Sequence, residues 1–154
     1  MSARRITAED GRRALRDHIV ERALLGRQRH GSPRDDAAFL RLLEDREVVR
    51  YPTIIEFGAA GLEPGEFGHA EPLGARPADG FRLLIHPRFR GRAGTLPLLA
   101  AYHLVAINYG EIATFEEAEL FGATLLGLDV DDYYKSLCAL ADELEGVVPA
   151  GDGP

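Results

Sequence analysis

Apolar residues recur at helical spacing over the first 45 residues of the chain and again after residue 95, a pattern that predicts helices at both ends. A first helix is expected over residues 7–26, with Thr7 as its N-cap and an acid three residues later. A second helix is expected over residues 32–45, with Ser32 as its N-cap and Pro33 as its first residue. Together the two predict an N-terminal helical hairpin.

Between the helical segments, β-branched and aromatic residues are separated by Gly and Pro. This composition predicts short strands at about 47–57, 66–71 and 81–86, with a turn at Glu63-Pro64-Gly65. Consecutive short strands joined by turns are typical of an antiparallel meander. We therefore expect a small antiparallel sheet of about three strands.

Three helices are expected in the C-terminal part. Residues 96–110 are apolar on nearly every side, which is typical of a central helix. Thr114 and Glu117 form a capping box that opens the next helix, and Asp129 opens the last one. The residues expected to face the core are Phe115, Ala118, Phe121 and Leu125 on the first of these two helices, and Val130, Tyr133, Leu137, Leu140 and Leu144 on the second.

The predicted fold class is therefore α+β, with an N-terminal helical hairpin, a small antiparallel sheet of about three strands and three C-terminal helices. The chain has 154 residues, of which 45% are hydrophobic, and this is enough for one domain with its own core. We expect a single domain over residues 1–146 and a disordered tail over residues 147–154, which is rich in Gly and Pro.

The single cysteine and the apolar pattern narrow the class of protein further. Cys138 lies within a predicted helix, so an intrachain disulfide and a Cys-rich zinc site are excluded and a buried structural thiol is expected. No apolar run approaches the roughly 18 residues of a membrane span. The Arg-rich start lacks the apolar segment of a signal peptide. We expect a soluble, cytoplasmic protein without membrane contact.

The formal net charge of −7 is unevenly distributed. Residues 1–50 hold 12 arginines and 9 acidic residues, whereas residues 51–154 hold 6 basic and 16 acidic residues. A nucleic-acid contact would have to use the N-terminal segment, but acids lie among its arginines at spacings that favour ion pairs within the helix. We therefore expect a solvated, salt-bridged first helix and no nucleic-acid partner.

His103, in the middle of the apolar helix, is the first candidate for chemistry, because a buried polar group without a hydrogen bond costs about 1–3 kcal/mol. As a core histidine it would bond to a backbone carbonyl, to Asn108 or to Tyr109. As a ligand it would bind a substrate or a divalent metal such as zinc, together with His69 and His86 if these face the same cleft. For either of these two alone, a surface or turn position is the simpler expectation.

A carboxylate would complete such a metal site, and Glu117, Glu111 and Glu71 are the candidates. Glu117 is already explained by the capping box, and its neighbours Glu116 and Glu119 should face solvent. A carboxylate in the first turn of a helix that follows a His-bearing helix can nevertheless reach a metal. The predicted metal ligands are therefore His69, His86, His103 and Glu117.

Arg88, Arg90 and Arg92 form the one concentrated positive segment of the C-terminal part. Alternating arginines after a strand could clamp an anionic ligand bidentately. The favoured alternative is pairing with the acidic helices, because the chain carries ten acids and one lysine between Gly110 and Glu145. Neither a glycine-rich phosphate loop nor a nucleophile elbow accompanies these arginines.

The order of elements also resembles a known family. A small sheet, a long His-bearing helix and a helix that begins Glu116-Glu117-Ala118-Glu119 are similar to the small bacterial zinc metallopeptidases of the zincin class, over residues 47–128. The resemblance implies a zinc ligand on the glutamate-bearing helix. The H-E-x-x-H motif is absent, because Leu104 stands at the position of the general base and Ile107 at that of the second histidine. The resemblance therefore implies a relative without peptidase activity.

Two function classes remain open at this point. The first is a non-enzymatic binding or interaction domain, in which a protein partner or a second copy of the chain meets the acidic helices or the arginine segment. The second is a divalent-metal-binding protein or metal-dependent hydrolase that uses the three histidines and a nearby glutamate. No residue is identified as catalytic by the sequence.

Overall fold

The computed structural model describes residues 7–145. The helices are α1 (Ala8–His30), α2 (Asp36–Leu42), α3 (Thr95–Tyr109), α4 (Phe115–Leu126) and α5 (Val130–Glu145). The strands are β1 (Thr53–Phe57), β2 (Gly68–Pro72) and β3 (Phe81–Ile85), and three short 3-10 helices are η1 (Pro77–Asp79), η2 (Pro87–Phe89) and η3 (Gly110–Ile112). The predicted α+β class is confirmed, while the predicted tail lies outside the described residues. In the described part of the chain, no helix combines the length and the apolar character that a membrane span needs.

The sheet has the order β1-β3-β2, with β1 parallel to β3 and β2 antiparallel to β3. The predicted antiparallel meander is therefore wrong, because the last strand lies between the first two. The physical reason is the apolar character of β3, whose Leu83, Leu84 and Ile85 are all buried. A strand covered on both faces belongs in the centre of a sheet, and the more polar β1 and β2 form its edges.

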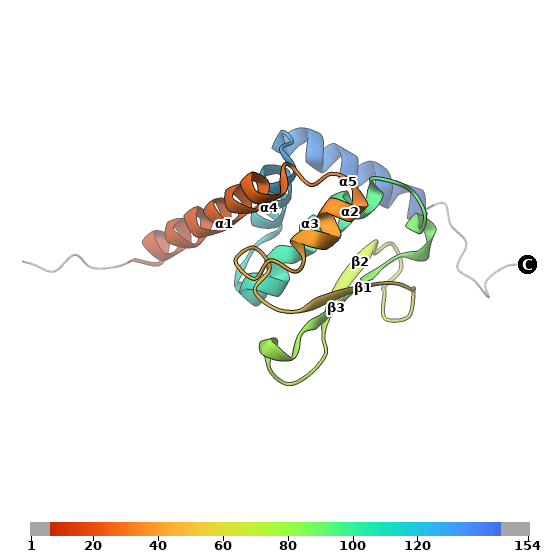
Figure 1. The fold of residues 1–154 in the computed structure, drawn as a ribbon, viewed down its shortest axis with the longest axis horizontal. Coiled ribbons are helices and arrows are strands. Elements are labelled where there is room, and N and C mark those ends of the chain that lie inside the picture. The colour runs from red at the N-terminus through yellow and green to blue at the C-terminus, as the bar shows by residue number, and fades with distance from the viewer. Residues whose placement is uncertain (1–6, 146–154) are drawn as a thin grey trace, which may run out of the picture.

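Helix α3 occupies the middle of the molecule, as its sequence predicts. It contacts the strands β2 and β3 on one side and the helices α2, α4 and α5 on others. In Figure 1 it lies between the sheet at the bottom of the view and α5 at the top. Because α3 is apolar on nearly every side, each of these neighbours covers a part of it that would otherwise meet water.

Helix α1 is longer than expected, because Gly26 does not end it. A Cβ on this glycine would lie 2.7 Å from Cδ1 of Leu125 and 2.9 Å from Cγ1 of Val48, so the residue serves the close packing of α1 against α4. The helix ends instead at Gly31, which adopts a left-handed conformation with φ 65°. Its most extensive contacts are with α4 rather than with α2, so the expected hairpin is the lesser of its two interfaces.

Two further expectations are corrected at helix starts. Ser32 does not cap α2, because its amide donates to the carbonyl of Arg27 at 3.2 Å and it therefore belongs to the end of α1. The N-cap is Asp35, whose carboxylate accepts from the amide of Ala38 at 2.8 Å. On α4, Phe115 does not join the core stripe, since its side chain is 78% exposed at the first position of the helix.

The contact between α4 and α5 depends on the absence of one side chain. Gly122 of α4 faces the ring of Tyr133 of α5, and a Cβ on that glycine would lie 2.5 Å from the ring and from the hydroxyl. The buried Tyr133 hydroxyl continues across this contact and donates to the carbonyl of Leu98 on α3 at 2.7 Å. One tyrosine thus joins three helices.

We expect Gly122→Ala to lower the free energy of unfolding by about 1–3 kcal/mol, because Tyr133 has to move to admit the methyl group and its hydrogen bond to α3 is strained. Gly11→Ala is the matched control, since a Cβ on this exposed glycine of α1 would meet nothing within 4 Å. There alanine should stabilise the helix by about 0.5–1 kcal/mol. Urea unfolding followed by circular dichroism measures both; equal effects would contradict the close contact between Gly122 and Tyr133.

Candidate functional site

His103 lies on the side of α3 that faces β2. Its Nε2 atom is buried against Gly68, where a Cβ would approach it to 2.8 Å. Its ring makes edge contacts with Phe67 and Tyr102, with centroids 5.4 Å apart in each case. Glycine at position 68 is therefore what allows an imidazole to fit between the helix and the sheet.

The hydrogen bonds expected for a core histidine are not formed. Nε2 of His103 has no partner among residues 7–145. Asn108 instead donates to the carbonyl of Val48 at 2.8 Å, and Tyr109 is joined to His18 by a hydrogen bond of 2.8 Å. Burial, together with the nearby His69, lowers the pKa of His103 to about 4. The ring is therefore neutral at pH 7.

Of the other predicted metal ligands, His69 lies near His103, with its side chain exposed on β2. His86 follows β3, where its Nδ1 accepts from the amide of Arg88 at 3.1 Å, and burial and the charge of Arg88 lower its pKa. Over residues 7–145, no three His, Cys, Asp or Glu side chains are gathered in a way that could hold a metal ion. The structure therefore does not bring His69, His86, His103 and Glu117 together.

Glu117 has structural partners instead. Its carboxylate accepts from the amide of Thr114 at 2.9 Å, which completes the predicted capping box, and it forms an ion pair with Arg12 of α1. Arg12 also donates to the carbonyl of Ile112 at 2.7 Å. The side chain of Glu117 is fully buried, so this pair fixes α1 against the start of α4. Of the other candidate carboxylates, Glu71 pairs with Arg82 at 3.3 Å.

The arginine segment pairs with α5, as the favoured alternative predicts. Arg92 binds both carboxylate oxygens of Glu143, at 2.6 Å and 3.2 Å, and Arg88 binds one of them at 3.2 Å. Arg90 donates to the carbonyl of Phe57 at 2.9 Å. All three predicted ligand-binding arginines are therefore occupied within the chain, and two of them hold the end of α5 to the loop after β3.

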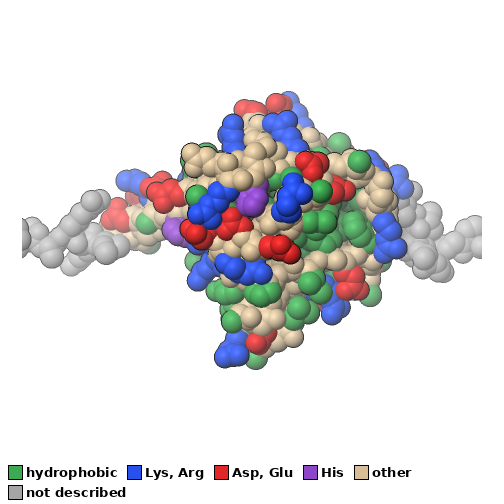
Figure 2. Space-filling model, in the orientation of Figure 1, with side chains coloured by type: hydrophobic (Ala, Val, Ile, Leu, Met, Phe, Trp, Pro, Cys, Tyr) green, Lys and Arg blue, Asp and Glu red, His purple; other side chains and the backbone are tan. Residues whose placement is uncertain are grey.

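The arginines of α1 pair mostly with other elements rather than along the helix. Arg13 and Glu9 form an i,i+4 pair at 3.9 Å. Arg29 instead reaches Asp45 at 3.2 Å and Glu47 at 3.1 Å, beyond the end of α2. Figure 2 shows basic and acidic side chains interspersed over the face that it presents, without a continuous basic area. The expectation that nucleic acid is not a partner stays a prediction from the sequence.

A pocket that the sequence did not indicate lies between α3, α4 and α5, with a volume of about 160 Å³. We call it the three-helix pocket. Its lining residues are Phe67, Tyr102, Glu119, Tyr134, Leu137, Cys138 and Ala141. Burial and the neighbouring Glu116 raise the pKa of Glu119, and burial and Glu119 raise the pKa of Tyr102. An apolar pocket with a few polar groups of shifted pKa is typical of binding sites.

One signal for this pocket is present in the sequence. Leu137, Cys138 and Ala141 follow Tyr134 by three, four and seven residues, which places all four on one side of α5. Leu137 also belongs to the core, and the other three extend the apolar face of α5 beyond it. Cys138 is correspondingly half-buried at the pocket and not a fully buried structural thiol.

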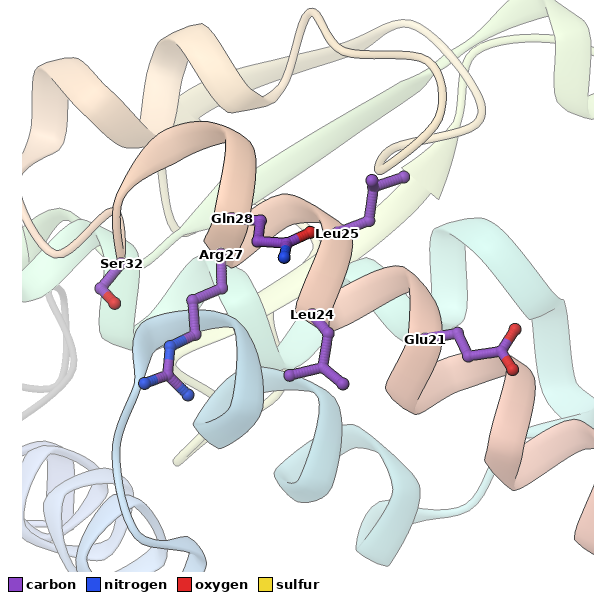
Figure 3. Close-up of a pocket in the computed structure, with 6 residues that line it drawn as sticks. All are labelled: Glu21, Leu24, Leu25, Arg27, Gln28 and Ser32. Atoms are coloured by element: carbon purple, nitrogen blue, oxygen red, sulfur yellow. The ribbon is translucent and has the colours of Figure 1, made fainter.

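A larger hollow of about 600 Å³ lies on α1. We call it the α1 groove. It is lined by Glu21, Leu24, Leu25, Arg27, Gln28 and Ser32. Figure 3 shows these side chains projecting from successive turns of α1, with Ser32 just after its C-terminal end. Because two leucines form its apolar part and polar side chains surround them, the groove resembles the centre and rim of a protein interface.

The low pKa of His103 predicts a loss of stability in acid. The unfolded histidine titrates near pH 6.5 and the folded one near pH 4. As the pH falls through this window the unfolded state takes up the proton first, so the free energy of unfolding should decrease by up to about 3 kcal/mol and lose nothing further from this group below pH 4.

Urea unfolding at intervals between pH 7 and pH 4 measures this dependence. His103→Leu should flatten it, because the titrating group is gone. Leu98→Ala, on the same helix, should lower the stability at every pH and keep the wild-type slope. An unchanged slope in His103→Leu would show that His103 is not the group responsible.

No protein-family model, no curated protein and no solved structure matches this chain. The resemblance of residues 47–128 to zinc metallopeptidases therefore stays a prediction from the sequence. What the chain does has to be inferred from the geometry of its own residues.

Proposed function

We propose that this chain is a non-enzymatic interaction domain that takes one aromatic side chain of a protein partner into the three-helix pocket. The observation that carries the proposal is the pocket itself, an open hollow of about 160 Å³ that aromatic, aliphatic and polar groups of three helices and Phe67 line. A cavity of about 150 Å³ accommodates a benzene molecule. The volume thus suits a single aromatic ring and is too small for most cofactors.

The chemistry of the walls favours an aromatic side chain with a hydrogen-bond donor, as in Tyr or Trp. Phe67, Tyr102 and Leu137 provide apolar and aromatic contacts. Glu119 provides an acceptor that is partly shielded from water, and Glu116 beside it adds negative charge. A partner with basic residues next to its aromatic side chain would complement this charge. The acidic helices are thereby part of the interface.

Two positions support a role without catalysis. Leu104 and Ile107, which stand where a zincin has its general base and its second histidine, are buried apolar residues. Neither can accept a proton or bind a metal. The alternative of a divalent-metal site or hydrolase is less well supported, because residues 7–145 contain no group of three His, Cys, Asp or Glu side chains that could hold a metal ion. A cytoplasmic location stays a prediction from the sequence.

We expect N-acetyl-L-tryptophanamide and N-acetyl-L-tyrosinamide to bind with dissociation constants in the millimolar range, roughly −4 kcal/mol, as for a single side chain without its partner. Titration of ¹⁵N-labelled protein, followed by NMR, should shift amide signals of α3, α4 and α5 around the pocket. N-acetyl-glycinamide should shift none of them.

Ala141→Leu should weaken this binding at least tenfold, because the larger side chain fills the pocket. Ala139→Leu is the matched control, since Ala139 is exposed on the same helix and does not line the pocket. Glu119→Gln keeps an acceptor and should bind nearly as well as the wild type, whereas Glu119→Leu should not. If both leucine variants at 139 and 141 bind like the wild type, the pocket is not the site.

The α1 groove favours a second candidate, self-association of the chain. Leu24 is 45% exposed at its centre. Glu21 and Arg27 lie three residues before and after it, so an antiparallel pair of α1 helices crossing at Leu24 would place Glu21 of one copy opposite Arg27 of the other. Symmetric dimers use such self-complementary surfaces.

We expect sedimentation velocity at rising protein concentration to show a monomer–dimer equilibrium. Leu24→Glu should abolish the dimer, because it places a charge at the centre of the interface. Leu40→Glu is the control, since Leu40 is similarly exposed on α2 and lies outside the groove. A wild-type chain that stays monomeric at all concentrations would exclude this second candidate and leave the first untouched.

A further inference from the structure

Two arginines from distant parts of the chain meet at the C-terminal end of α3. The guanidinium of Arg22, on α1, lies over the ring of Tyr109 at 5.2 Å from its centroid. Arg50, just before β1, donates through Nη1 to the carbonyl of Asn108 at 3.1 Å. Because Asn108 and Tyr109 are consecutive residues, both arginines contact the same end of α3, where the charge of Arg50 acts on Arg22.

Arg22 is unlike the arginines of the chain that are held by hydrogen bonds. Arg12, which is also partly buried, donates to the carbonyl of Ile112, and the more exposed Arg34 and Arg46 donate to backbone carbonyls as well. Arg22 has neither a hydrogen bond nor an ion pair with any residue from 7 to 145, and its Nη1 atom is buried. A guanidinium carries five N–H donors, and leaving those on the buried Nη1 without an acceptor is unfavourable.

Arg50 adds a second charge without a carboxylate. Arg50 is exposed; within the described part of the chain its guanidinium bonds to a backbone carbonyl, lies 5.2 Å from the ring centroid of Tyr51 and forms no ion pair with an acidic side chain. Burial lowers the pKa of Arg22, Tyr109 and Tyr51 raise it, and the charge of Arg50 lowers it. This mutual repulsion is relieved when an anion binds between the two groups.

The surrounding contacts fix both arginines in advance. The amide of Arg50 donates to Oδ1 of Asn108 at 2.8 Å, and the same side chain donates to the carbonyl of Val48. Tyr109, on which Arg22 rests, is held by its hydrogen bond of 2.8 Å to His18. These contacts exist before a ligand binds, so binding would cost less conformational entropy.

We propose that Arg22 and Arg50 form a binding site for a small phosphate-type anion. Two guanidinium groups balance a dianion, and each presents N–H donors in the planar arrangement that matches phosphate oxygens. Glu21, which acts on Tyr109, is the acidic group that faces this site. Glu21 is exposed on α1. Its negative charge therefore lowers the affinity for an anion but does not neutralise Arg22 and Arg50. The site is separate from the three-helix pocket and adjoins the α1 groove, which Glu21 also lines.

The first experiment uses inorganic phosphate as the probe and NMR of the full chain as the measurement. Phosphate should shift the signals of the Arg22 and Arg50 side chains and of the Tyr109 amide, with saturation. Arg22→Gln and Arg50→Gln should each weaken binding at least tenfold. Arg13→Gln is the control, because Arg13 lies on the same helix and pairs only with Glu9; its binding should equal that of the wild type.

Two further measurements separate specific binding from general effects of salt and charge. Arg22→Lys keeps the charge and loses the planar donors, so it should bind more weakly than the wild type and better than Arg22→Gln. Sodium chloride at equal ionic strength should not reproduce the shifts. If chloride does reproduce them, or if Arg13→Gln loses as much affinity as Arg22→Gln, the proposal is wrong.

The source of the phosphate group is distinguished by O-phospho-L-serine. Tighter binding of this compound than of inorganic phosphate would indicate a phosphate carried by a larger molecule, and weaker binding would indicate the free ion. If Arg22→Gln does not fold, as judged by circular dichroism, Arg50→Gln and Arg22→Lys still decide the question, because each alters one guanidinium at a time.

Discussion

The burial of α3 on nearly every side is the constraint on which the rest of this structure depends. A helix with no charged residue between Thr95 and Tyr109 cannot leave a face in water. The sheet covers one side of it, and α2, α4 and α5 cover others. Tyr133 then reaches from α5 past Gly122 to the backbone of α3. The remaining elements are arranged around these contacts, and α1 joins the molecule mainly through α4.

The same burial decides what His103 can do. Its ring is held between Gly68 and two aromatic rings, without a hydrogen-bond partner among the described residues and with a pKa of about 4. A neutral imidazole in this position packs like an aromatic residue. The polar groups that remain available for a partner lie one layer further out, at Glu119 and Tyr134. The candidate site is therefore displaced from the histidine that the sequence makes most conspicuous.

Features that depend on neighbouring residues could be predicted from the sequence, and those that depend on distant ones could not. The caps at Thr7 and Thr114 were predictable, because each is a pattern of four residues. The position of β3 in the sheet was not, since strand order is set by which strand is buried on both faces. Glu117 illustrates both cases: its capping role is local, whereas its ion pair with Arg12 joins residues from opposite ends of the chain. The three-helix pocket draws on four separate segments, which no local pattern specifies.

The mixed sheet also has a consequence for the order in which the chain assembles. Strands β2 and β3 are neighbours along the chain and pair antiparallel, so their contact closes a short loop. Strand β1 pairs in parallel with β3 across the whole of residues 58–80, and closing this longer loop costs more conformational entropy. The hairpin of β2 and β3 can thus form early, and β1 can pair with the open edge of β3 only after that hairpin has formed. We therefore expect β1 to be the last of the three strands to pair.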